Sequence, residues 1–377
     1  MNKRIFLISF CLWIEAVAIS LCANAIKVLG YHEGLSSNYV QAIAQDKYGF
    51  LWFATEEGLN RFDGSDFQTF YKTDGLSANQ LNCVADDPER PVMWIGTQRD
   101  GLCAFDYEKC QFTNYFHDDN NPKSLITNDI TSLYPAHDGQ LWISTYWHGI
   151  DKLDQQSGTF THFNRQTVKG LPSNQAWCVM DDGNGLLYIG HVTDGLSIID
   201  IKSRKLVAHF SHTSEQSSLS GNDVHCIFKD KLGNIWVGTD NGLDLYDPMN
   251  RSFIHFTDNG RLKRRIFDIK QFGNSLWLAT EQGGIAVIDL SRRFFSHDAL
   301  PQINYISEGE NSDNLNGNSV RSLFEDQFGN IWAGMYGGGV NVIMHRQDQF
   351  TCINRPPYIY KKNINAQSIL SIVLDNE

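Results

Sequence analysis

The sequence lacks the short motifs by which many enzymes and metal proteins are recognised. It contains no C-x-x-C pair and no H-x-x-x-H pair, two spacings typical of zinc sites. It also has no G-x-S-x-G nucleophile elbow and no glycine loop of the kind that cradles phosphates. We therefore expect no metal, no cofactor and no enzymatic activity from this chain.

Positive charge is also scarce. The 31 lysines and arginines are outnumbered by 43 aspartates and glutamates, which gives a formal net charge of −12. A strongly acidic chain repels the phosphate backbone of nucleic acids, so we expect no nucleic-acid partner. Such a charge favours neutral or cationic ligands.

A long apolar run occurs only at the amino terminus. Two basic residues precede an apolar run from residue 5 to 21, and an A-x-A site follows at 23–25. This order predicts a secretory signal peptide at residues 1–25. Glu15 inside the run argues against a retained membrane anchor, because a carboxylate at bilayer depth is costly. We therefore expect an exported chain.

The sequence does contain one motif in seven copies. Each copy places an aromatic residue in a short apolar stretch that is followed by a glycine. The anchor aromatics are Trp52, Trp94, Trp142, Tyr188, Trp236, Trp277 and Trp332. They lie 42, 48, 46, 48, 41 and 55 residues apart. A period of this length predicts stacked copies of one supersecondary unit, none of which can bury its apolar face alone.

Each copy predicts four short strands. In the last complete copy these begin with an inner strand at 318–324, a second at 331–334 and a third at 340–343. Four short strands per unit are typical of a β-propeller blade, so we expect an all-β, seven-bladed propeller over residues 26–357. A further outer-type strand at 26–31 precedes the first unit. We expect it to complete the seventh blade and close the ring, because an open ring would expose an edge.

The cysteines fit this fold without disulfides. Three of them share one position of the inner strand with alanine, serine and aspartate. This small position comprises Ala42, Cys83, Ser132, Cys178, Cys226, Asp268 and Ser322. Inner strands crowd around the central axis, so we expect a small side chain there and the anchor aromatics packed between sheets one strand farther out. Cys103 and Cys110 flank a turn and could form a bridge, which the spacing leaves open.

The carboxyl end begins the motif once more. Residues 368–375 match residues 319–326 position by position, with Ser371 at the small position. We therefore expect residues 358–377 to start a further repeat, and the chain to be the front part of a longer protein or a truncated product.

The repeat resembles the two-component regulator propeller repeat. The clearest copy runs from Asn222 to Leu243 and includes Asp230, Gly233 and Trp236 at the family's spacing. The resemblance implies the periplasmic input region of a hybrid histidine kinase, which recognises oligosaccharides and passes the signal to a kinase portion outside this chain. The fourth copy departs from the pattern, since it has tyrosine and histidine where tryptophan and threonine are usual.

Loops on one face of the ring are the expected ligand site. The outer-to-inner loops and the T-x-x-G loops share this face, and the longest insertions, at 117–122, 211–221 and 307–317, lie there. The candidate ligand contacts are Arg99, Asp100, Tyr146, Trp147, His148, Asp194 and Tyr336. Trp147 is the leading candidate, because it lies outside the repeat pattern and would otherwise expose apolar area.

Two other functions stay open. A propeller glycosidase needs two carboxylates that flank the scissile bond, and Asp268 near the axis is a candidate for one of them. A protein-interaction scaffold, which could include a homodimer, needs no small ligand.

The remaining signals are weaker. Residues 118–120 offer oxygens for calcium but lack the rest of a calcium loop, so a solvated turn is expected. The basic run at 261–265 is expected to be a solvated turn as well. We expect ordinary polar or packed histidines at His32, His191 and His225.

Overall fold

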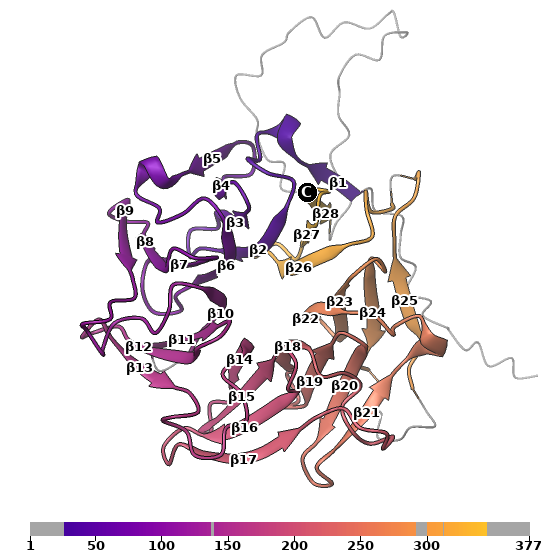
Figure 1. The fold of residues 1–377 in the computed structure, drawn as a ribbon. Helices are drawn as coiled ribbons and strands as arrows, with labels where there is room; N and C mark the ends of the chain where they lie inside the picture. The colour runs from indigo at the N-terminus through magenta and orange to yellow at the C-terminus, as the bar shows by residue number, and fades with distance from the viewer. Residues whose placement is uncertain (1–25, 137–138, 292–299, 312, 345–377) are drawn as a thin grey trace, which may run out of the picture. The chain divides into compact units, whose positions relative to one another are not determined.

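The computed structural model of the protein describes residues 26–136, 139–291, 300–311 and 313–344. Within these ranges the strands form seven antiparallel sheets of four strands each, which are the blades of a ring (Figure 1). The inner strands of neighbouring blades pack against each other around the whole ring. The predicted seven-bladed all-β propeller is confirmed. The signal peptide expected at 1–25 and the further repeat expected at 358–377 lie outside the described residues.

Each blade begins at the axis and proceeds outward. The inner strands are β2 (Val40–Gln45), β6 (Leu81–Asp86), β10 (Ile130–Pro135), β14 (Ala176–Asp181), β18 (Val224–Lys229), β22 (Ile266–Phe272) and β26 (Val320–Glu325). The second strands are β3 (Leu51–Thr55), β7 (Val92–Thr97), β11 (Gln140–Thr145), β15 (Leu186–His191), β19 (Ile235–Thr239), β23 (Ser275–Thr280) and β27 (Ile331–Met335).

The outer half of each blade carries the third and fourth strands. The third strands are β4 (Gly58–Phe62), β8 (Leu102–Asp106), β12 (Gly149–Asp154), β16 (Leu196–Asp200), β20 (Gly242–Asp247), β24 (Ile285–Asp289) and β28 (Val340–Ile343). The outermost strands are β5 (Phe67–Phe70), β9 (Gln111–Tyr115), β13 (Thr159–Phe163), β17 (Lys205–Phe210), β21 (Ser252–Phe256), β25 (Ile303–Ile306) and β1 (Ile26–Leu29). Short 3-10 turns follow three outer strands: η1 (Tyr31–Glu33), η2 (Lys72–Asp74) and η3 (Asp258–Gly260).

Ring closure joins the two ends of the described chain. β1 pairs with β28 in antiparallel register, from Ile26 opposite Ile343 to Leu29 opposite Val340. It therefore supplies the fourth strand of the blade whose other three strands end the ring. The predicted closure by the amino-terminal strand is confirmed, and it covers the edge that β28 would otherwise expose.

The anchor aromatics pack between neighbouring blades, as expected. Trp52 is fully buried, stacks on Phe70 of its own blade and meets Phe105 of the next blade at 5.4 Å between ring centroids. Large flat side chains of this kind contribute most of the apolar area that adjacent sheets share. Trp332 makes the equivalent contact with Phe53 of the first blade at 6.0 Å, so aromatic packing joins the last, first and second blades.

A carboxylate in the first turn of the blade fixes four of the anchors, Trp52, Trp94, Trp236 and Trp332. In the first blade, Asp46 Oδ1 accepts the backbone N–H groups of Tyr48 and Phe50, while Oδ2 accepts the indole N–H of Trp52 at 2.8 Å. The same arrangement recurs at Asp230 with Trp236 and at Asp326 with Trp332. One aspartate therefore closes the turn and orients the tryptophan, which explains its place in the repeat.

Trp277 is the exception among the anchors. It is only partly buried, whereas full burial was expected from its place in the repeat. Gln271 stands where the turns of those four anchors carry aspartate, and its side chain is engaged by the backbone of Lys231 and Gly273. Without a carboxylate to receive the indole, the ring is less firmly directed into the space between blades.

The possible bridge between Cys103 and Cys110 is not formed. Both residues are free thiols. Cys103 is buried, and its sulfur bonds Ser77 and Asn114 instead. It acts as a small buried side chain that holds a loop.

Buried aspartate–histidine pairs anchor two of the long loops. Asp151 on β12 accepts the backbone N–H of Ile126 and lies 2.5 Å from Nδ1 of His162 on β13. Asp244 on β20 repeats this pattern with the backbone of Ser220 and with Nδ1 of His255 at 2.6 Å. Each pair therefore ties a third strand and an outer strand to the loop that leads into the inner strand of the same blade.

Candidate functional site

Every inner strand carries a β-bulge at the same place. The pairing of the inner with the second strand skips one residue, immediately before the small position. The seven bulge residues are Gln41, Asn82, Thr131, Trp177, His225, Phe267 and Arg321. A bulge re-aims its side chain away from the regular alternation. These seven side chains line the central channel and differ from blade to blade, although the residues beside them are similar.

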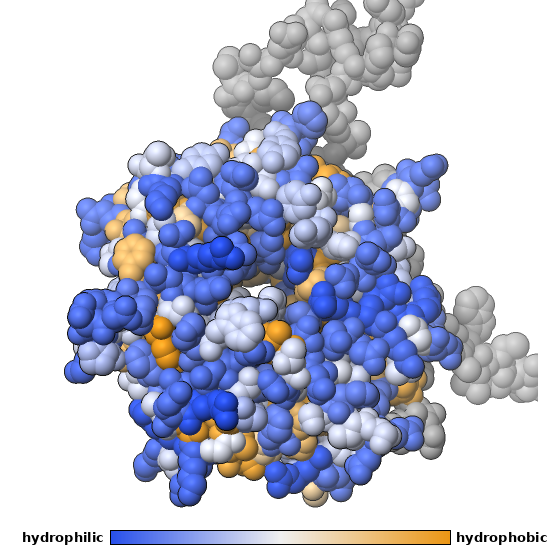
Figure 2. All heavy atoms as spheres, in the orientation of Figure 1, coloured by the Kyte–Doolittle hydropathy of each residue, from blue (hydrophilic) through white to orange (hydrophobic). Residues whose placement is uncertain are grey.

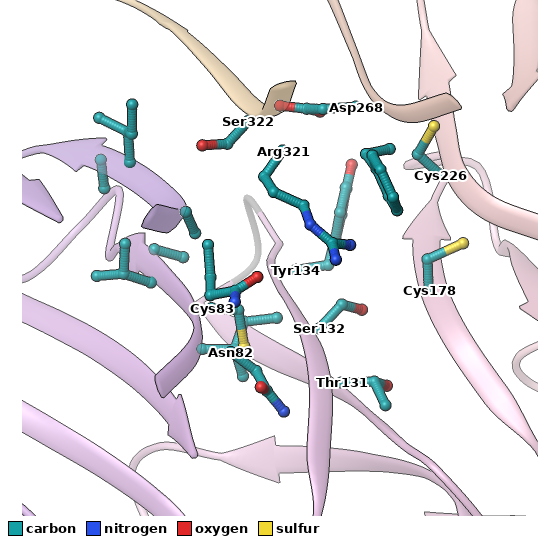
Figure 3. A pocket seen from close by; sticks show the side chains of 18 of the residues that line it. Asn82, Cys83, Thr131, Ser132, Tyr134, Cys178, Cys226, Asp268, Arg321 and Ser322 are labelled. Carbon is teal, nitrogen blue, oxygen red and sulfur yellow. The ribbon is translucent and has the colours of Figure 1, made fainter. Parts of the chain in front are cut away.

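The channel has a volume of about 1130 Å³ and is lined by residues of all seven inner strands. Figure 3 shows the side chains of Asn82, Thr131 and Arg321 around this space, with the small position represented by Cys83, Ser132, Cys178, Cys226, Asp268 and Ser322. Figure 2 shows a mainly hydrophilic face that is hollowed near the centre of the ring. Small residues thus keep the channel open, and the bulge residues determine its chemistry.

Aromatic rings form a continuous arc along one side of the mouth. Tyr146 contacts Trp147 at 4.9 Å and Trp177 at 6.0 Å between ring centroids. Trp177 meets His225 at 5.3 Å, and His225 meets Phe267 at 5.6 Å. The arc therefore passes from the third blade to the sixth.

Arg321 extends this arc to the first blade. Its guanidinium carbon lies 4.0 Å from the ring centroid of Phe267 and 4.9 Å from that of Tyr336. Tyr336 in turn meets Tyr39 at 4.9 Å. Tyr39 and Tyr336 also form a backbone bridge between the first and last blades. We call the eight residues Tyr39, Tyr146, Trp147, Trp177, His225, Phe267, Arg321 and Tyr336 the mouth arc.

The opposite side of the mouth is polar. Asn82 donates to the carbonyl of Ile130 at 2.7 Å, and Thr131 donates to the carbonyl of Ala176 at 3.0 Å, so both side chains also connect neighbouring blades. Gln41 donates to Glu56 at 3.3 Å. Each of these amide and hydroxyl groups still has an oxygen that can accept a hydrogen bond.

Asp129 adds a carboxylate to the polar side. Burial raises its pKa above the usual range, while the nearby positive charges of Arg99 and His148 act in the opposite direction. Arg99 and Asp129 both line the channel. The group can therefore accept hydrogen bonds from a ligand or, when protonated, donate one.

His225 is a buried polar group without hydrogen bonds. The residue is 8% exposed, and neither ring nitrogen has a hydrogen-bond partner. Nε2 lies 3.2 Å from Asp223 Oδ2, but without the alignment of a hydrogen bond. A buried polar atom usually has a partner, so this histidine is a group that a bound molecule could satisfy.

The structure brings four of the seven predicted ligand contacts together. Tyr146, Trp147 and Tyr336 belong to the mouth arc, and Arg99 lines the channel beside Asp129. Trp147 is 54% exposed, which agrees with its placement outside the repeat pattern. Their role in binding stays a prediction.

The other three predicted contacts lie apart from the channel lining. His148 is exposed near Asp129. Asp100 is exposed and its backbone N–H donates to Thr97. Asp194 accepts a long hydrogen bond from Thr193 at 3.4 Å. These residues stay candidates only for a ligand that extends beyond the mouth.

Asp268, the carboxylate considered for catalysis, is already engaged. Oδ2 accepts the backbone N–H of Leu323 at 3.0 Å, Oδ1 accepts that of Ile269, and Lys270 pairs with Oδ1 at 3.2 Å. This carboxylate therefore connects β22 to β26, and its bonds give it a structural role.

The basic run at 261–265 is not a simple solvated turn, contrary to expectation. Arg261 lies 3.9 Å from the ring centroid of Tyr305, and Arg265 pairs with Asp223 and Glu281. The aromatic ring and the carboxylates explain why these arginines fold back onto the protein.

The remaining weak signals have ordinary roles. His32 is exposed in η1, and residues 118–120 form a turn in which Asp118 accepts the backbone N–H of Asn120. His191 is buried against Ser197, and burial lowers its pKa to about 4. Among the residues that the structure describes, no three histidine, cysteine or carboxylate side chains cluster as metal ligands.

Sequence reasoning missed Trp177, Phe267 and Arg321 and assigned His225 an ordinary role. The available signal was positional, since each of these residues directly precedes the small position of its repeat. The residue just before the small position is the most varied one in an otherwise regular strand. A regular strand would alternate its side chains, so only the bulge reveals that these residues face the channel.

No helix among the described residues has the length and apolar character that a membrane crossing requires.

Comparison with known proteins shows what the chain resembles. A sequence model of the two component regulator propeller matches residues 34–57, 124–147, 218–241 and 314–337. A curated protein called histidine kinase P4, from Formosa agariphila, is 28% identical over 341 residues. That match covers 86% of this chain and 23% of the kinase.

Solved structures add a closer likeness. The extracellular domain of a putative hybrid two component system from B. thetaiotaomicron is 44% identical, with a TM-score of 0.76. The match covers 85% of this chain and 42% of that domain. The extracellular domain of a putative one component system from the same organism has a TM-score of 0.67 at 20% identity, which shows the fold alone.

The chain thus resembles the extracellular domains of two component systems. More particularly, four of its segments match the two component regulator propeller. The chain spans less than half the length of the relatives described above.

Proposed function

We propose that this chain is the ligand-sensing propeller of an exported two-component signalling protein, and that it binds an oligosaccharide at the mouth of the central channel. The observation that carries the proposal is the mouth arc of rings in edge-to-face contact, opposite a row of amide, hydroxyl and carboxylate groups. Sugars have apolar C–H faces and polar hydroxyl edges, so a site with one aromatic and one polar wall matches both.

The length of the arc favours an oligosaccharide over a single sugar. The ring contacts run from Trp147 on the third blade to Tyr39 on the first, past every blade between them. Successive sugar units can each meet a different aromatic residue along this path. The seven bulge residues would then set specificity, because they vary while the scaffold repeats.

Signal transfer requires a second state of the protein. A ligand shifts an equilibrium only as far as it binds one state better than the other. Tyr39 and Tyr336 contact each other across the seam where the ring closes, so a ligand that touches Tyr336 can affect how the first and last blades meet. The partner that reads this change would be the kinase portion of a longer protein.

Calorimetric titration with a panel of neutral and acidic oligosaccharides tests the proposal. At least one sugar should bind, and Trp147→Ala and Trp177→Ala should each weaken that binding about tenfold, since one lost aromatic contact is worth roughly 1–2 kcal/mol. Phe328→Ala is the matched control: this ring is 72% exposed, in the turn at the far end of β26.

Three outcomes distinguish the functions. Binding that is lost in the arc variants but retained in the control supports the sensor. If no sugar binds, the proposal fails and an interaction scaffold is favoured. If a sugar is cleaved and Asp268→Asn abolishes the cleavage, the chain is a glycosidase.

A further inference from the structure

Arg321 brings a positive charge into the channel. It is the bulge residue of β26, and its guanidinium reaches into the space between the inner strands (Figure 3). The rings of Phe267 and Tyr336 lie 4.0 Å and 4.9 Å from its guanidinium carbon. Stacking of this kind restrains the guanidinium and leaves its N–H edge for another partner.

That N–H edge has no protein acceptor. Within the described part of the chain, Arg321 has no hydrogen bond and no carboxylate within ion-pair distance, and its Nε is buried without a partner. An arginine side chain carries five donors and stays charged at any physiological pH. Partial burial of such a group is costly unless an acceptor compensates it.

The nearby carboxylates do not contact Arg321. Glu281 and Glu56 are close enough to influence Arg321 electrostatically. Glu281 pairs with Arg265 at 3.4 Å, and Glu56 accepts a hydrogen bond from Gln41. Arg265 also faces Asp223, so its charge is balanced within the protein. Among the described residues, Arg321 is therefore the cation of this cluster without a carboxylate in contact with it.

We propose that the channel mouth selects acidic oligosaccharides, and that Arg321 binds the anionic substituent of one sugar unit. The substituent is a carboxylate or a sulfate ester, since both offer paired oxygens to the guanidinium fork. The neighbouring units stack on the rest of the mouth arc. This inference rests on the proposed function and gives it a substrate class.

The negative net charge of the chain argues against an acidic ligand, but most of these charges lie too far from the mouth to act on a bound sugar. A formal charge of −12 favours neutral or cationic ligands when the whole molecule is considered. Charges on the outer surface are screened over about 8–10 Å at physiological salt. A bound anion at the mouth is therefore governed by the groups in contact with it, of which Arg321 is the unpaired cation.

The test compares matched pairs of sugars by calorimetry. Uronate oligosaccharides are paired with their carboxyl-reduced forms, and sulfated oligosaccharides with their desulfated forms. At least one acidic member should bind about ten- to a hundredfold more tightly than its neutral counterpart, and raised NaCl should weaken it. The pair that responds identifies carboxylate or sulfate as the substituent.

Variants of Arg321 test whether this residue causes the preference for acidic sugars. Arg321→Gln should remove the preference, so that the acidic and neutral members of a pair bind with similar affinity. Arg321→Lys should restore part of it, because lysine keeps the charge but not the fork. Lys231→Gln is the control for net charge, since Lys231 is exposed in a turn at the far end of β18.

Every other outcome overturns the inference. Equal binding of acidic and neutral members, or a preference that survives Arg321→Gln, means that Arg321 only stacks between blades, while the sensor proposal stands. Binding of neutral members alone leads to the same conclusion. If no sugar of either kind binds, both proposals fail.

Discussion

At the scale of single residues, the turn aspartate has the most consequential bonds in the repeat. Asp230 accepts the backbone N–H groups of Leu232 and Asn234 through Oδ1. Its Oδ2 accepts the indole N–H of Trp236 at 2.9 Å. The carboxylate and indole are both buried, so neither can turn to water if the other is removed.

Asp230→Asn should destabilise the propeller by about 1.5–3 kcal/mol. The asparagine oxygen can still receive the backbone N–H groups, but its –NH₂ group cannot accept the indole N–H of Trp236. Urea unfolding followed by tryptophan fluorescence measures the change in the free energy of unfolding.

Asp63→Asn is the matched control for this change. Asp63 is exposed, and only its Oδ1 receives bonds, from Ser65 and Asp66. An amide oxygen can take over that role, so this variant should differ from the parent by less than about 0.5 kcal/mol. Equal effects of the two substitutions would contradict the assigned role of the indole bond.

The same scale shows what the sequence can and cannot predict. The anchors and the small position are periodic, so their burial could be predicted, and Trp277 deviates where Gln271 replaces aspartate. Trp177 and Arg321 could not be placed, because their orientation depends on a bulge in backbone pairing rather than on side-chain pattern. Three of the predicted contacts, Tyr146, Trp147 and Tyr336, therefore belong to the mouth arc, whereas Trp177 and Arg321 were not predicted.

At the scale of elements, the Asp–His pairs connect loops to blades. His255 donates from Nε2 to the carbonyl of Gln216 at 2.7 Å, and Nδ1 faces Asp244. Because both nitrogens face acceptors, the imidazolium form fits best. The bond to Asp244 raises the pKa of His255, although burial opposes this. The pKa of His162 is also raised, by its bond to Asp151.

This arrangement predicts a loss of stability as pH rises above 6.5. A histidine whose folded pKa exceeds its unfolded value of about 6.5 contributes fully below that pH, and its contribution disappears as pH rises through the folded pKa. Each unit by which the pKa is raised corresponds to about 1.4 kcal/mol. His191 acts with the opposite sign between about 4 and 6.5, so it does not interfere above this window.

His255→Gln should make the free energy of unfolding less dependent on pH between 6.5 and 9. The variant should be less stable than the parent at pH 6.5, and the difference should narrow toward pH 9. Urea titrations at a series of pH values measure the free energy of unfolding. His32→Gln is the control, because His32 is an exposed histidine in η1. Parallel pH profiles for His255→Gln and the parent would rule out the imidazolium pair.

At the scale of the whole molecule, the ring is closed by β1, the first strand along the chain. β1 supplies a buried side chain, Leu29, to the core between the last and first blades, where it packs near Val340 and Trp332. The sequence was sufficient to predict this closure, because an unmatched outer strand precedes the first repeat. A closed ring has no free edge, so each blade depends on both neighbours.

Leu29→Ala should therefore lower the stability of the whole propeller by about 2–5 kcal/mol, the usual range for a buried leucine. Val28 alternates to the solvent side of β1 and is 39% exposed, so Val28→Ala should cost well under half as much and serves as control. Far-UV circular dichroism and tryptophan fluorescence should report one coincident urea transition, since the tryptophans lie between blades all around the ring. If the two probes separate in Leu29→Ala, the last blade unfolds alone, and the ring is a set of independent units rather than one cooperative structure.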